Sequence, residues 1–254
     1  MIERTAHPVG DFCFAELSSS DQEGSISFYS NLFGWERRDD PIGDGVVFSD
    51  MFVDGRQVCE ITPQDPAARA AGERPQWNCY IAVDSADDSA SRATHFGGTV
   101  AVSPRDVPGA GRLAVIADPQ GASFRVWEAR GHIGASLLDH PGAIAWYSLG
   151  SPDPAGVADF YRGLFGWELT TSDHSGETHV DIRNNDRLQG CIRSVASDQD
   201  SGWIVSFGTA QLDSTLQRAR QLGGDCRTDP TSTSRGGWAH LTDAQGTRFD
   251  LLGI

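Results

Sequence analysis

The chain has 254 residues, of which 39% are hydrophobic, and it carries a formal net charge of −15. A chain of this length supports two globular domains with cores of their own. The negative charge repels phosphate backbones and anionic lipid surfaces, which argues against nucleic acid and membranes as partners. No apolar run approaches the length of a membrane-spanning helix, and the first residues lack the apolar stretch of a secretory signal.

Five cysteines are present and include no CxxC pair: Cys13, Cys59, Cys79, Cys191 and Cys226. Their odd number and the apolar, strand-like surroundings of four of them predict free buried thiols rather than a disulfide framework. Free thiols are typical of a reducing compartment, so we expect a cytoplasmic protein.

The first predicted element is a strand over residues 12–17, whose alternation puts Phe12, Phe14 and Glu16 on one face. A helix is expected next, because Asp21 can cap it and apolar residues follow at helical spacing. About three strands come after that helix. A stretch rich in proline, alanine and charge then reads as a linker.

The same order of elements then recurs along the chain. Further helices are predicted over residues 86–96, 154–164 and 212–222, each preceded by a strand and followed by strands. The chain therefore holds four βαβββ units. We expect a first domain over residues 1–130, a linker over 131–142 and a second domain over 143–254.

Two motifs show that the second half duplicates the first. The string FYxxLFGWE starts at Phe28 and again at Phe160, which are 132 residues apart. The strings DPQGASF, starting at Asp118, and DAQGTRF, starting at Asp243, close the two copies. Matched landmarks in the same order indicate a tandem domain, since the repeats of solenoids are far shorter.

Paired βαβββ units with these motifs resemble the vicinal oxygen chelate superfamily, which includes glyoxalase I, extradiol dioxygenases, and fosfomycin and bleomycin resistance proteins. The strings VPGAGR at 107–112, DPQGA at 118–122 and HIGA at 132–135 are most similar to an actinobacterial two-domain glyoxalase-like subfamily. The resemblance implies an α+β fold, in which four βαβββ units form two tandem glyoxalase-like domains with open, curled mixed sheets.

The resemblance also implies where a divalent metal would bind, because members hold it with His or Glu from the first and last strands of each unit. By spacing, these positions are Phe14, Glu60, Asn78 and Arg125 in the first copy and Trp146, Cys191, Ile204 and Asp250 in the second. No histidine is among them, only Glu60 and Asp250 are ordinary carboxylate ligands, and Asn78 and Cys191 lack enough companions to hold an ion. We therefore expect no metal and no other cofactor, which argues against a metal-dependent lyase or dioxygenase.

Two functions stay open. The first is a metal-independent enzyme of lyase or isomerase type that acts on a small organic molecule by acid–base chemistry. Natural-product metabolism is one setting for such an enzyme. Charged groups on apolar strands are costly unless they are paired or used, so Glu16, Glu60 and Asp250 are the catalytic candidates. The second function is a non-catalytic binding or resistance protein for a drug or antibiotic, which aromatic walls would suit.

The residues expected to bind the substrate share inward-facing strand positions. They are Phe14, Asn78, Tyr80, Arg125, Trp127, Trp146, Ser148 and Cys191. Each also has a structural alternative, namely core packing for the aromatic residues and an ion pair with Glu16 or Glu60 for Arg125. If units from different copies shared one site, Glu60 and Asp250 would lie in one cavity. The expected assembly is a monomer or a homodimer.

Overall fold

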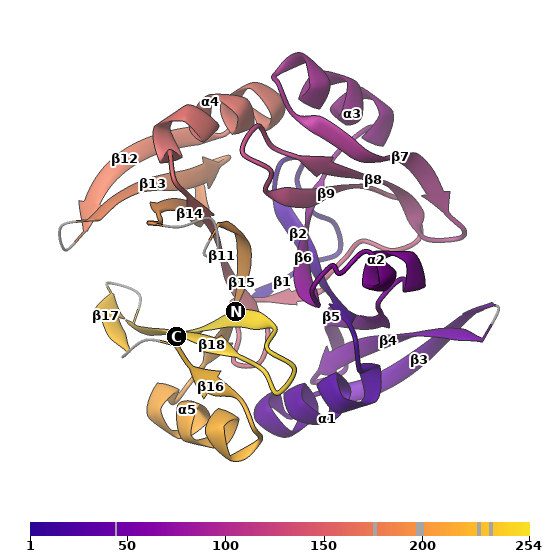
Figure 1. The fold of residues 1–254 in the computed structure, drawn as a ribbon, viewed down its shortest axis with the longest axis vertical. Helices are drawn as coiled ribbons and strands as arrows, with labels where there is room; N and C mark the ends of the chain where they lie inside the picture. The colour runs from indigo at the N-terminus through magenta and orange to yellow at the C-terminus, as the bar shows by residue number, and fades with distance from the viewer. Residues whose placement is uncertain (44, 175–176, 197–200, 228–229, 234–235) are drawn as a thin grey trace.

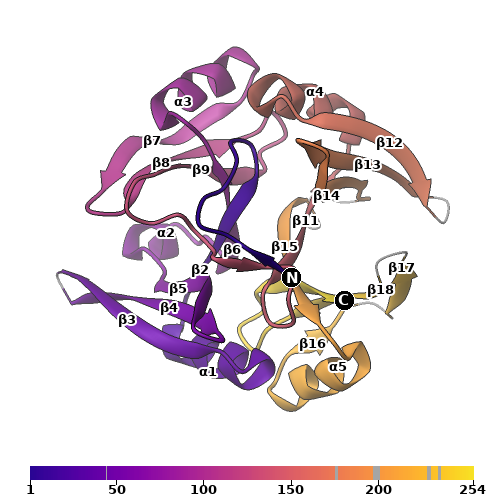
Figure 2. The same cartoon turned by 180° about the vertical axis from the view of Figure 1, so that it is seen from behind.

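The computed structural model describes residues 1–43, 45–174, 177–196, 201–227, 230–233 and 236–254. Within these residues the chain forms two large mixed sheets, one for each copy (Figures 1 and 2). The first sheet has the order β3 (Glu36–Gly43), β4 (Val46–Val53), β5 (Arg56–Pro63), β2 (Phe12–Ser19), β6 (Gln76–Ala82), β9 (Ser123–Ala129), β8 (Gly111–Ala117), β7 (Thr99–Val107).

The second sheet repeats this order with a few additions. It runs β12 (Glu168–His174), β13 (Glu177–Asn184), β14 (Arg187–Ser194), β11 (Ile144–Ser151), β15 (Gly202–Thr209), β19 (Arg248–Gly253), β18 (Gly236–Thr242), β16 (Asp225–Cys226). The short strand β17 (Thr231–Thr233) pairs with β18, and β1 (Ile2–Glu3) joins through β10 (Leu137–Leu138). The expected α+β fold of four βαβββ units in two open mixed sheets is confirmed.

The two units of a copy meet in the middle of one sheet. Strands β2 and β6 pair antiparallel in the first copy, as β11 and β15 do in the second. Outward from these central strands, each sheet continues with parallel pairs, such as β2 with β5 and β6 with β9. Each copy therefore builds its own continuous sheet face, a point that the sequence left open.

The four predicted helices are all present. They are α1 (Gln22–Phe33), α3 (Ala86–His95), α4 (Pro154–Phe165) and α5 (Leu212–Gln221), and the predicted linker adds a short α2 (Pro66–Ala70). The Asp21 carboxylate caps α1 by accepting a hydrogen bond from the Gly24 amide. The helix ends at Gly34, whose φ of 75° lies in the left-handed region that glycine adopts most easily.

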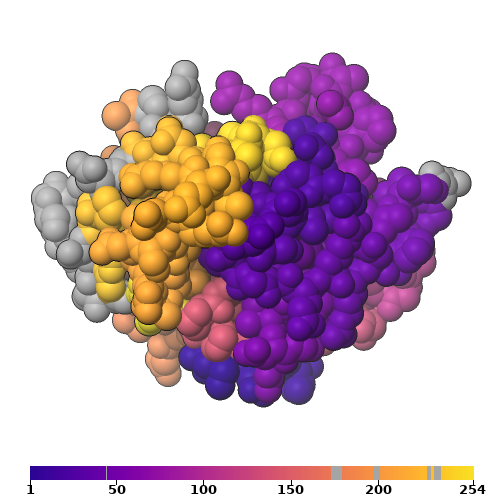
Figure 3. Space-filling model, turned by 90° about the horizontal axis from the view of Figure 1, so that it is seen from below, coloured from indigo at the N-terminus to yellow at the C-terminus, as the bar shows by residue number. Residues whose placement is uncertain are grey.

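Helices from different copies lie side by side at both ends of the molecule. Figures 1 and 2 show α1 beside α5 at one end and α3 beside α4 at the other. From below, the indigo surface of the α1 region meets the orange surface of the α5 region along a continuous seam (Figure 3). The two copies are therefore packed into one body.

The repeated motifs themselves make the contact between copies. The Tyr29 hydroxyl of the first FYxxLFGWE string donates to the Asp243 carboxylate of the second copy at 3.1 Å. The Tyr161 hydroxyl of the second string donates in the same way to Asp118 of the first copy at 2.9 Å. Both acids are buried, and burial raises the pKa of each. The motifs that reveal the duplication are thus also the parts that join its halves.

One expected side-chain orientation is wrong. Phe12 was predicted to share a face with Phe14 and Glu16, but the pairing of β2 with β6 shifts register between residues 12 and 14. Phe12 instead stacks on Tyr147 of the second copy, with ring centroids 4.1 Å apart. Such an irregularity reverses the alternation that a regular strand would keep.

Two further features of the chain are the character of its helices and the state of its cysteines. Among the described residues, the helices are all too short or too polar to cross a membrane. The five cysteines are all free, and Cys13, Cys59, Cys79 and Cys191 are buried.

Candidate active site

The side of the first sheet that faces away from the helices carries most of the predicted site residues. Trp77 and Phe124 point toward the helices, because they pack against Tyr29 of α1 and Tyr161 of α4. Their neighbours Asn78 and Arg125 therefore point the other way. We call this side, which carries Phe14, Glu16, Glu60, Asn78, Tyr80, Arg125 and Trp127, the first open face.

Three carboxyl groups lie in a row across this face. Asp50 on β4 is directly opposite Glu60 on β5, and Glu60 is directly opposite Glu16 on β2. Side chains directly opposite one another in a sheet have Cβ atoms about 5 Å apart, so three ionised groups there would repel strongly. The row must therefore be neutralised in part, either by a cation or by a retained proton.

Glu16 is neutralised by a cation and two hydroxyl groups. Its Oε2 forms an ion pair with Arg125 and accepts a hydrogen bond of 2.6 Å from the Tyr80 hydroxyl. Its Oε1 accepts a hydrogen bond of 2.7 Å from Thr62. Glu16 is only 7% exposed, so both oxygens are engaged and little of the group reaches solvent. The ion pair is the structural alternative that the sequence offered for Arg125.

The surroundings of Glu60 favour the protonated form of its carboxyl group. Burial raises the pKa of Glu60 well above its usual value, and the neighbouring charges of Glu16 and Asp50 act in the same direction. Burial also raises the pKa of Asp50, to about 6, and a hydrogen bond with Glu60 acts against that rise. Asp50 therefore accepts the proton that Glu60 holds, and the two acids form a proton-sharing pair.

This pair predicts that the protein loses stability as the pH rises. The folded-state pKa values of both acids are raised, so the folded state binds more protons than the unfolded state above about pH 4. The stabilisation is complete below that pH and is lost as pH rises through about 6. Because Asp50 is only half-buried, we expect its share to be about 1–2 kcal/mol after solvent screening.

Urea unfolding at pH 4.5 and pH 7.5 measures this loss. Asp50→Asn should reduce the difference between the two pH values by about 1–2 kcal/mol, whereas the exposed control Asp84→Asn should leave it unchanged. In both variants the free energy of unfolding should still depend on pH to some extent, because Asp118 and Asp243 also have raised pKa values. If Asp50→Asn left the difference in unfolding free energy between the two pH values unchanged, the shared proton would be contradicted.

Aromatic rings line one side of the carboxyl row. The Phe14 ring lies edge-on to Tyr80, with centroids 5.8 Å apart, and Tyr80 lies edge-on to Trp127 at 6.2 Å. His132 completes this wall, 5.1 Å from Phe14 between ring centroids. Its Nε2 is 2.9 Å from Oε1 of Gln57. Phe14, Tyr80 and Trp127 thus lie together as predicted, beside a histidine that the sequence placed in the linker.

The structure adds partners that sequence reasoning missed. Asp50, Gln57, Thr62 and His132 all contact predicted site residues or one another. Gln57 connects two of them, because its Nε2 donates to Asp50 at 2.6 Å while its oxygen meets His132. Asp50 stands at an inward-facing position of a predicted strand, so alternation could have marked it. The register of β4 against β5, which puts it opposite Glu60, could not be read from the sequence.

The corresponding side of the second sheet, which we call the second open face, is built differently. It carries Trp146, Ser148, Cys191, Ser206, Trp238, His240 and Asp250. Asp250 is 1% exposed and accepts hydrogen bonds from Trp238 Nε1 at 2.9 Å and, at 2.7 Å, from His240 Nδ1. Burial raises the pKa of the Cys191 thiol to about 11, so it stays protonated and is a poor nucleophile.

Asp250 does not join the other two catalytic candidates. It lies on β19 in the second sheet, whereas Glu60 and Glu16 lie on β5 and β2 in the first. The alternative in which Glu60 and Asp250 share one cavity is therefore wrong, because the units of each copy pair with each other and not across copies. Asp250 lies on the second open face, where its Oδ1 is 2.7 Å from His240 Nδ1.

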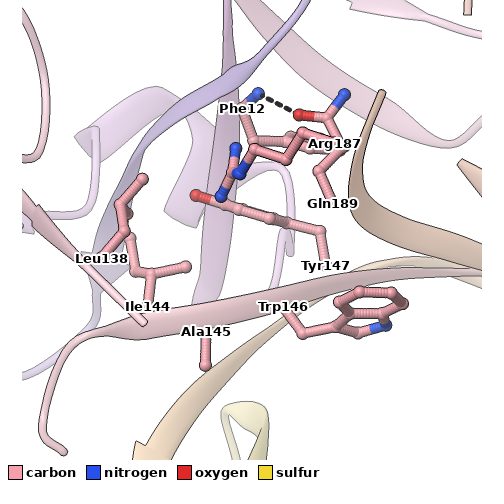
Figure 4. A pocket seen from close by; sticks show the side chains of 8 residues that line it. All are labelled: Phe12, Leu138, Ile144, Ala145, Trp146, Tyr147, Arg187 and Gln189. Carbon is pink, nitrogen blue, oxygen red and sulfur yellow. Dashed lines mark hydrogen bonds between the residues drawn. The ribbon is translucent and has the colours of Figure 1, made fainter. Parts of the chain in front are cut away.

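Two hollows lie near these faces. A cavity of about 10 Å³ lies beside β11, where Figure 4 shows Trp146 and Tyr147 on opposite sides of the strand. It has room for little more than a water molecule. A cleft of about 300 Å³ lies between the copies and reaches Gln76 and Asn78 at the edge of the first open face. The Gln76 amide donates to Asn78 at 3.0 Å, so Asn78 links the cleft to that face.

The residues at the eight expected metal positions do not fit a metal. In the first copy, the Phe14 ring offers no donor atom and Arg125 brings a positive charge that is held by Glu16. In the second copy, Trp146 and Ile204 offer no suitable donor, and both oxygens of Asp250 are engaged. Across the described residues, no group of three or more His, Cys, Asp or Glu side chains is placed to hold an ion.

Comparison with known proteins identifies relatives over the whole chain. The glyoxalase-like domain family matches residues 13–127 and 146–252. "Putative glyoxylase CFP32" of Mycobacterium tuberculosis is 32% identical over 256 residues, covering 99% of this chain and 98% of that protein. "Anthracycline biosynthesis protein DnrV" of Streptomyces peucetius is 32% identical over 260 residues, covering 93% of this chain and 90% of that protein.

Solved structures share the fold at low sequence identity. The Mn(II)-bound glyoxalase from Novosphingobium aromaticivorans has a TM-score of 0.67 at 17% identity, covering 96% of this chain and 82% of that one. The 2,2',3-trihydroxybiphenyl 1,2-dioxygenase from Sphingomonas wittichii has a TM-score of 0.68 at 13% identity, covering 97% and 91%. At this level of identity, the likeness concerns the fold alone.

Proposed function

The chain belongs to the glyoxalase-like domain family of the vicinal oxygen chelate superfamily, and from this premise we propose that it is an enzyme that needs no metal for proton transfer. Its substrate is a small organic molecule bound on the first open face. The observation that carries the proposal is the row of three carboxyl groups, in which an ion pair holds Glu16 and a hydrogen bond joins Glu60 to Asp50. The row provides a proton donor and an acceptor side by side.

The contacts within the row leave Glu60 as the proton donor and leave Arg125 and Tyr80 as the groups that orient the substrate. Glu60 donates its proton to an enolate oxygen of the substrate, so that the Glu60 O–H bond breaks as the enol O–H bond forms. A proton from solvent then returns to Glu60 through Asp50, which has a pKa of about 6. Arg125 and Tyr80 are held by Glu16 and provide a fixed positive edge that orients an electron-rich group. Glu16 therefore serves as a positioning residue rather than as the base that its sequence position suggested.

The aromatic wall indicates a flat substrate. The rings of Phe14, Tyr80 and Trp127 are mostly buried and leave only narrow apolar edges on this face, which suit a thin planar molecule, and Asn78 lies at the entrance from the cleft. A relative is named for anthracycline biosynthesis, so we propose a polycyclic hydroxyquinone and a role in natural-product metabolism. The reaction is of isomerase or lyase type, since proton transfer alone supplies no electrons.

The cellular setting and the assembly are also proposals. Five free cysteines support a cytoplasmic protein. Helices of the two copies already pack against each other, α1 on α5 and α3 on α4, which supports a monomer, with a homodimer as the alternative.

Metal removal tests this function directly. The protein is treated with EDTA, dialysed, and incubated with a panel of hydroxyanthraquinones, and products are followed by liquid chromatography and mass spectrometry. We expect conversion to stay within twofold of that of the untreated protein, because the residues of the first open face do not fit a metal. A loss of more than tenfold that Mn²⁺ restores would overturn the proposal.

A binding protein is the second candidate function, and the aromatic wall is the observation that favours it. The same experiment separates the two. If the panel contains compounds that bind with micromolar affinity but are recovered unchanged, the first open face sequesters its ligand. A compound that is both bound and converted supports the enzyme.

A further inference from the structure

The first eight residues contact the joint between the two copies, and the proposed function does not use them. Figure 2 shows the N-terminus at the centre of the molecule, where the copies meet. Strand β1 pairs antiparallel with β10, and the Arg4 amide donates to the Ser136 carbonyl at 2.9 Å. His7 Nε2 lies 2.8 Å from the Ala135 carbonyl oxygen. Residues 1–8, which we call the N-terminal strap, therefore bind the linker that joins the copies.

The linker is in turn attached to the first sheet. The Ala135 amide donates to the Cys13 carbonyl, and the Ser136 amide donates to the Gln57 carbonyl, both at 2.8 Å. Three residues before Ala135, the ring of His132 completes the aromatic wall of the first open face. The strap thus holds a segment that carries part of this wall, so a movement of the strap would reach the wall through the linker.

The contact with Ala135 determines which form of His7 fits the bound strap. A carbonyl oxygen can only accept a hydrogen bond, so Nε2 carries the proton of the neutral ring and Nδ1 carries the lone pair. Nδ1 is enclosed, and it has no hydrogen-bond partner in the part of the chain that the structure describes. A second proton on the ring would therefore become a buried donor without an acceptor, which is costly.

The charges around the ring also oppose a second proton. Those that act on it are Arg4 and Asp11 from the N-terminal segment and Arg187 from β14. Asp11 is 1% exposed, lies 3.6 and 3.3 Å from the two arginines, and accepts a hydrogen bond of 2.8 Å from Asn184. The single acid is therefore already engaged. Burial lowers the pKa of His7, and the two arginines add to this against the backbone hydrogen bond and the charge of Asp11.

We propose that the N-terminal strap is a pH-sensitive switch, in which neutral His7 binds the linker and protonated His7 releases it. A proton from water adds to Nδ1, and the charged ring then leaves its enclosed place for solvent. The released ring takes up protons more readily than the bound one, so the strap is held most firmly above about pH 6.5 and loosens as the pH falls below it. Release frees the linker that carries His132, and this regulation of the first open face rests on the proposed function.

Amide hydrogen exchange of the full chain at pH 7.5 and pH 5 tests the switch. After correction for intrinsic exchange rates, opening at the Arg4 amide should increase about fivefold at pH 5. The Ala135 and Ser136 amides should follow with smaller increases, because the strap holds the linker. The Val83 amide, which donates to the Trp127 carbonyl within the first copy, reports on opening of the sheet and should not increase.

Two variants show whether His7 is the group that responds. His7→Gln keeps a donor for the Ala135 carbonyl but cannot become charged, so its Arg4 amide should open equally at both pH values. The matched control His95→Gln changes an exposed histidine on α3 and should keep the wild-type response. In the wild type, the midpoint of the increase should coincide with the protonation of His7 in ¹⁵N spectra, a result that does not depend on the folding of any variant.

Three outcomes would overturn the switch: equal opening of the wild-type Arg4 amide at both pH values, an undiminished increase in His7→Gln, or a midpoint that differs from that of His7. An increase at Arg4 without one at Ala135 and Ser136 would overturn the link to the first open face. None of these measurements needs a substrate. Failure of the proposed function would instead appear in the turnover of Glu60 variants, so the two proposals fail separately.

Discussion

Replacement of Glu60 by glutamine is expected to lower turnover by about 10²–10⁴-fold, with KM changed by no more than a few fold. Glutamine keeps the shape of the side chain and can still donate a hydrogen bond to Asp50. It cannot release a proton to the substrate, so only the chemical step loses its donor. Steady-state kinetics on the compound that the hydroxyquinone panel identifies provides the measurement.

Two further variants make this result specific. Asp50→Asn should lower turnover less than Glu60→Gln does, because Asp50 only returns a proton to the donor. The Asp50→Asn variant should also lose the limb of the pH–rate profile near pH 6. Glu73→Gln, which changes an exposed residue, should leave turnover within twofold of the wild type. Turnover above half the wild-type value in Glu60→Gln would rule out Glu60 as the proton donor.

Replacement of Glu16 by glutamine is expected to lower the free energy of unfolding by about 2–4 kcal/mol. The change leaves the Arg125 guanidinium, whose side chain is 20% exposed, without its counter-ion and weakens the contact with the Tyr80 hydroxyl. Charges that have lost their partner in a partly buried site cost far more than broken surface pairs. Urea unfolding at pH 5 measures the loss.

The Glu23–Arg37 pair provides a matched control on the surface. Its atoms are 2.8 Å apart, but the Glu23 side chain is 73% exposed, so Glu23→Gln should cost less than about 1 kcal/mol. Repeating the measurement at pH 8 adds a second check. Without Glu16, the pKa of Glu60 should fall, so that Glu60 ionises and partly replaces the missing charge beside Arg125. A loss equal to that of Glu23→Gln would show that Arg125 needs no partner.

The two open faces show how a duplicated fold diverges. Matching positions hold Glu16 and Ser148, Glu60 and Cys191, and Arg125 and Asp250. The first face thereby gains a charged row, while the second gains a buried carboxylate that holds a histidine. Because each copy closes its own sheet, these changes could accumulate separately without disturbing the shared core.

Much of the fold was readable from local chemistry. Asp21 and the apolar residues at helical spacing after it predicted the first helix, and the structure adds the left-handed glycines that end α1 at Gly34 and α4 at Gly166. The repeated motifs predicted the duplication. Alternation also placed Glu16, Tyr80 and Arg125 on one face, because side-chain direction in a regular strand depends only on position along that strand.

The pairing of strands decided the rest. Alternation cannot say which strands become neighbours or in what register, since hydrogen bonds between strands join residues far apart in sequence. Only the folded sheet puts Asp50 beside Glu60, brings His132 from the linker to Phe14, and sets His240 against Asp250. By itself, the sequence determined the units, their duplication and the inward-facing residues; tertiary pairing decided which of those residues touch, and therefore which protons they can hold or pass on.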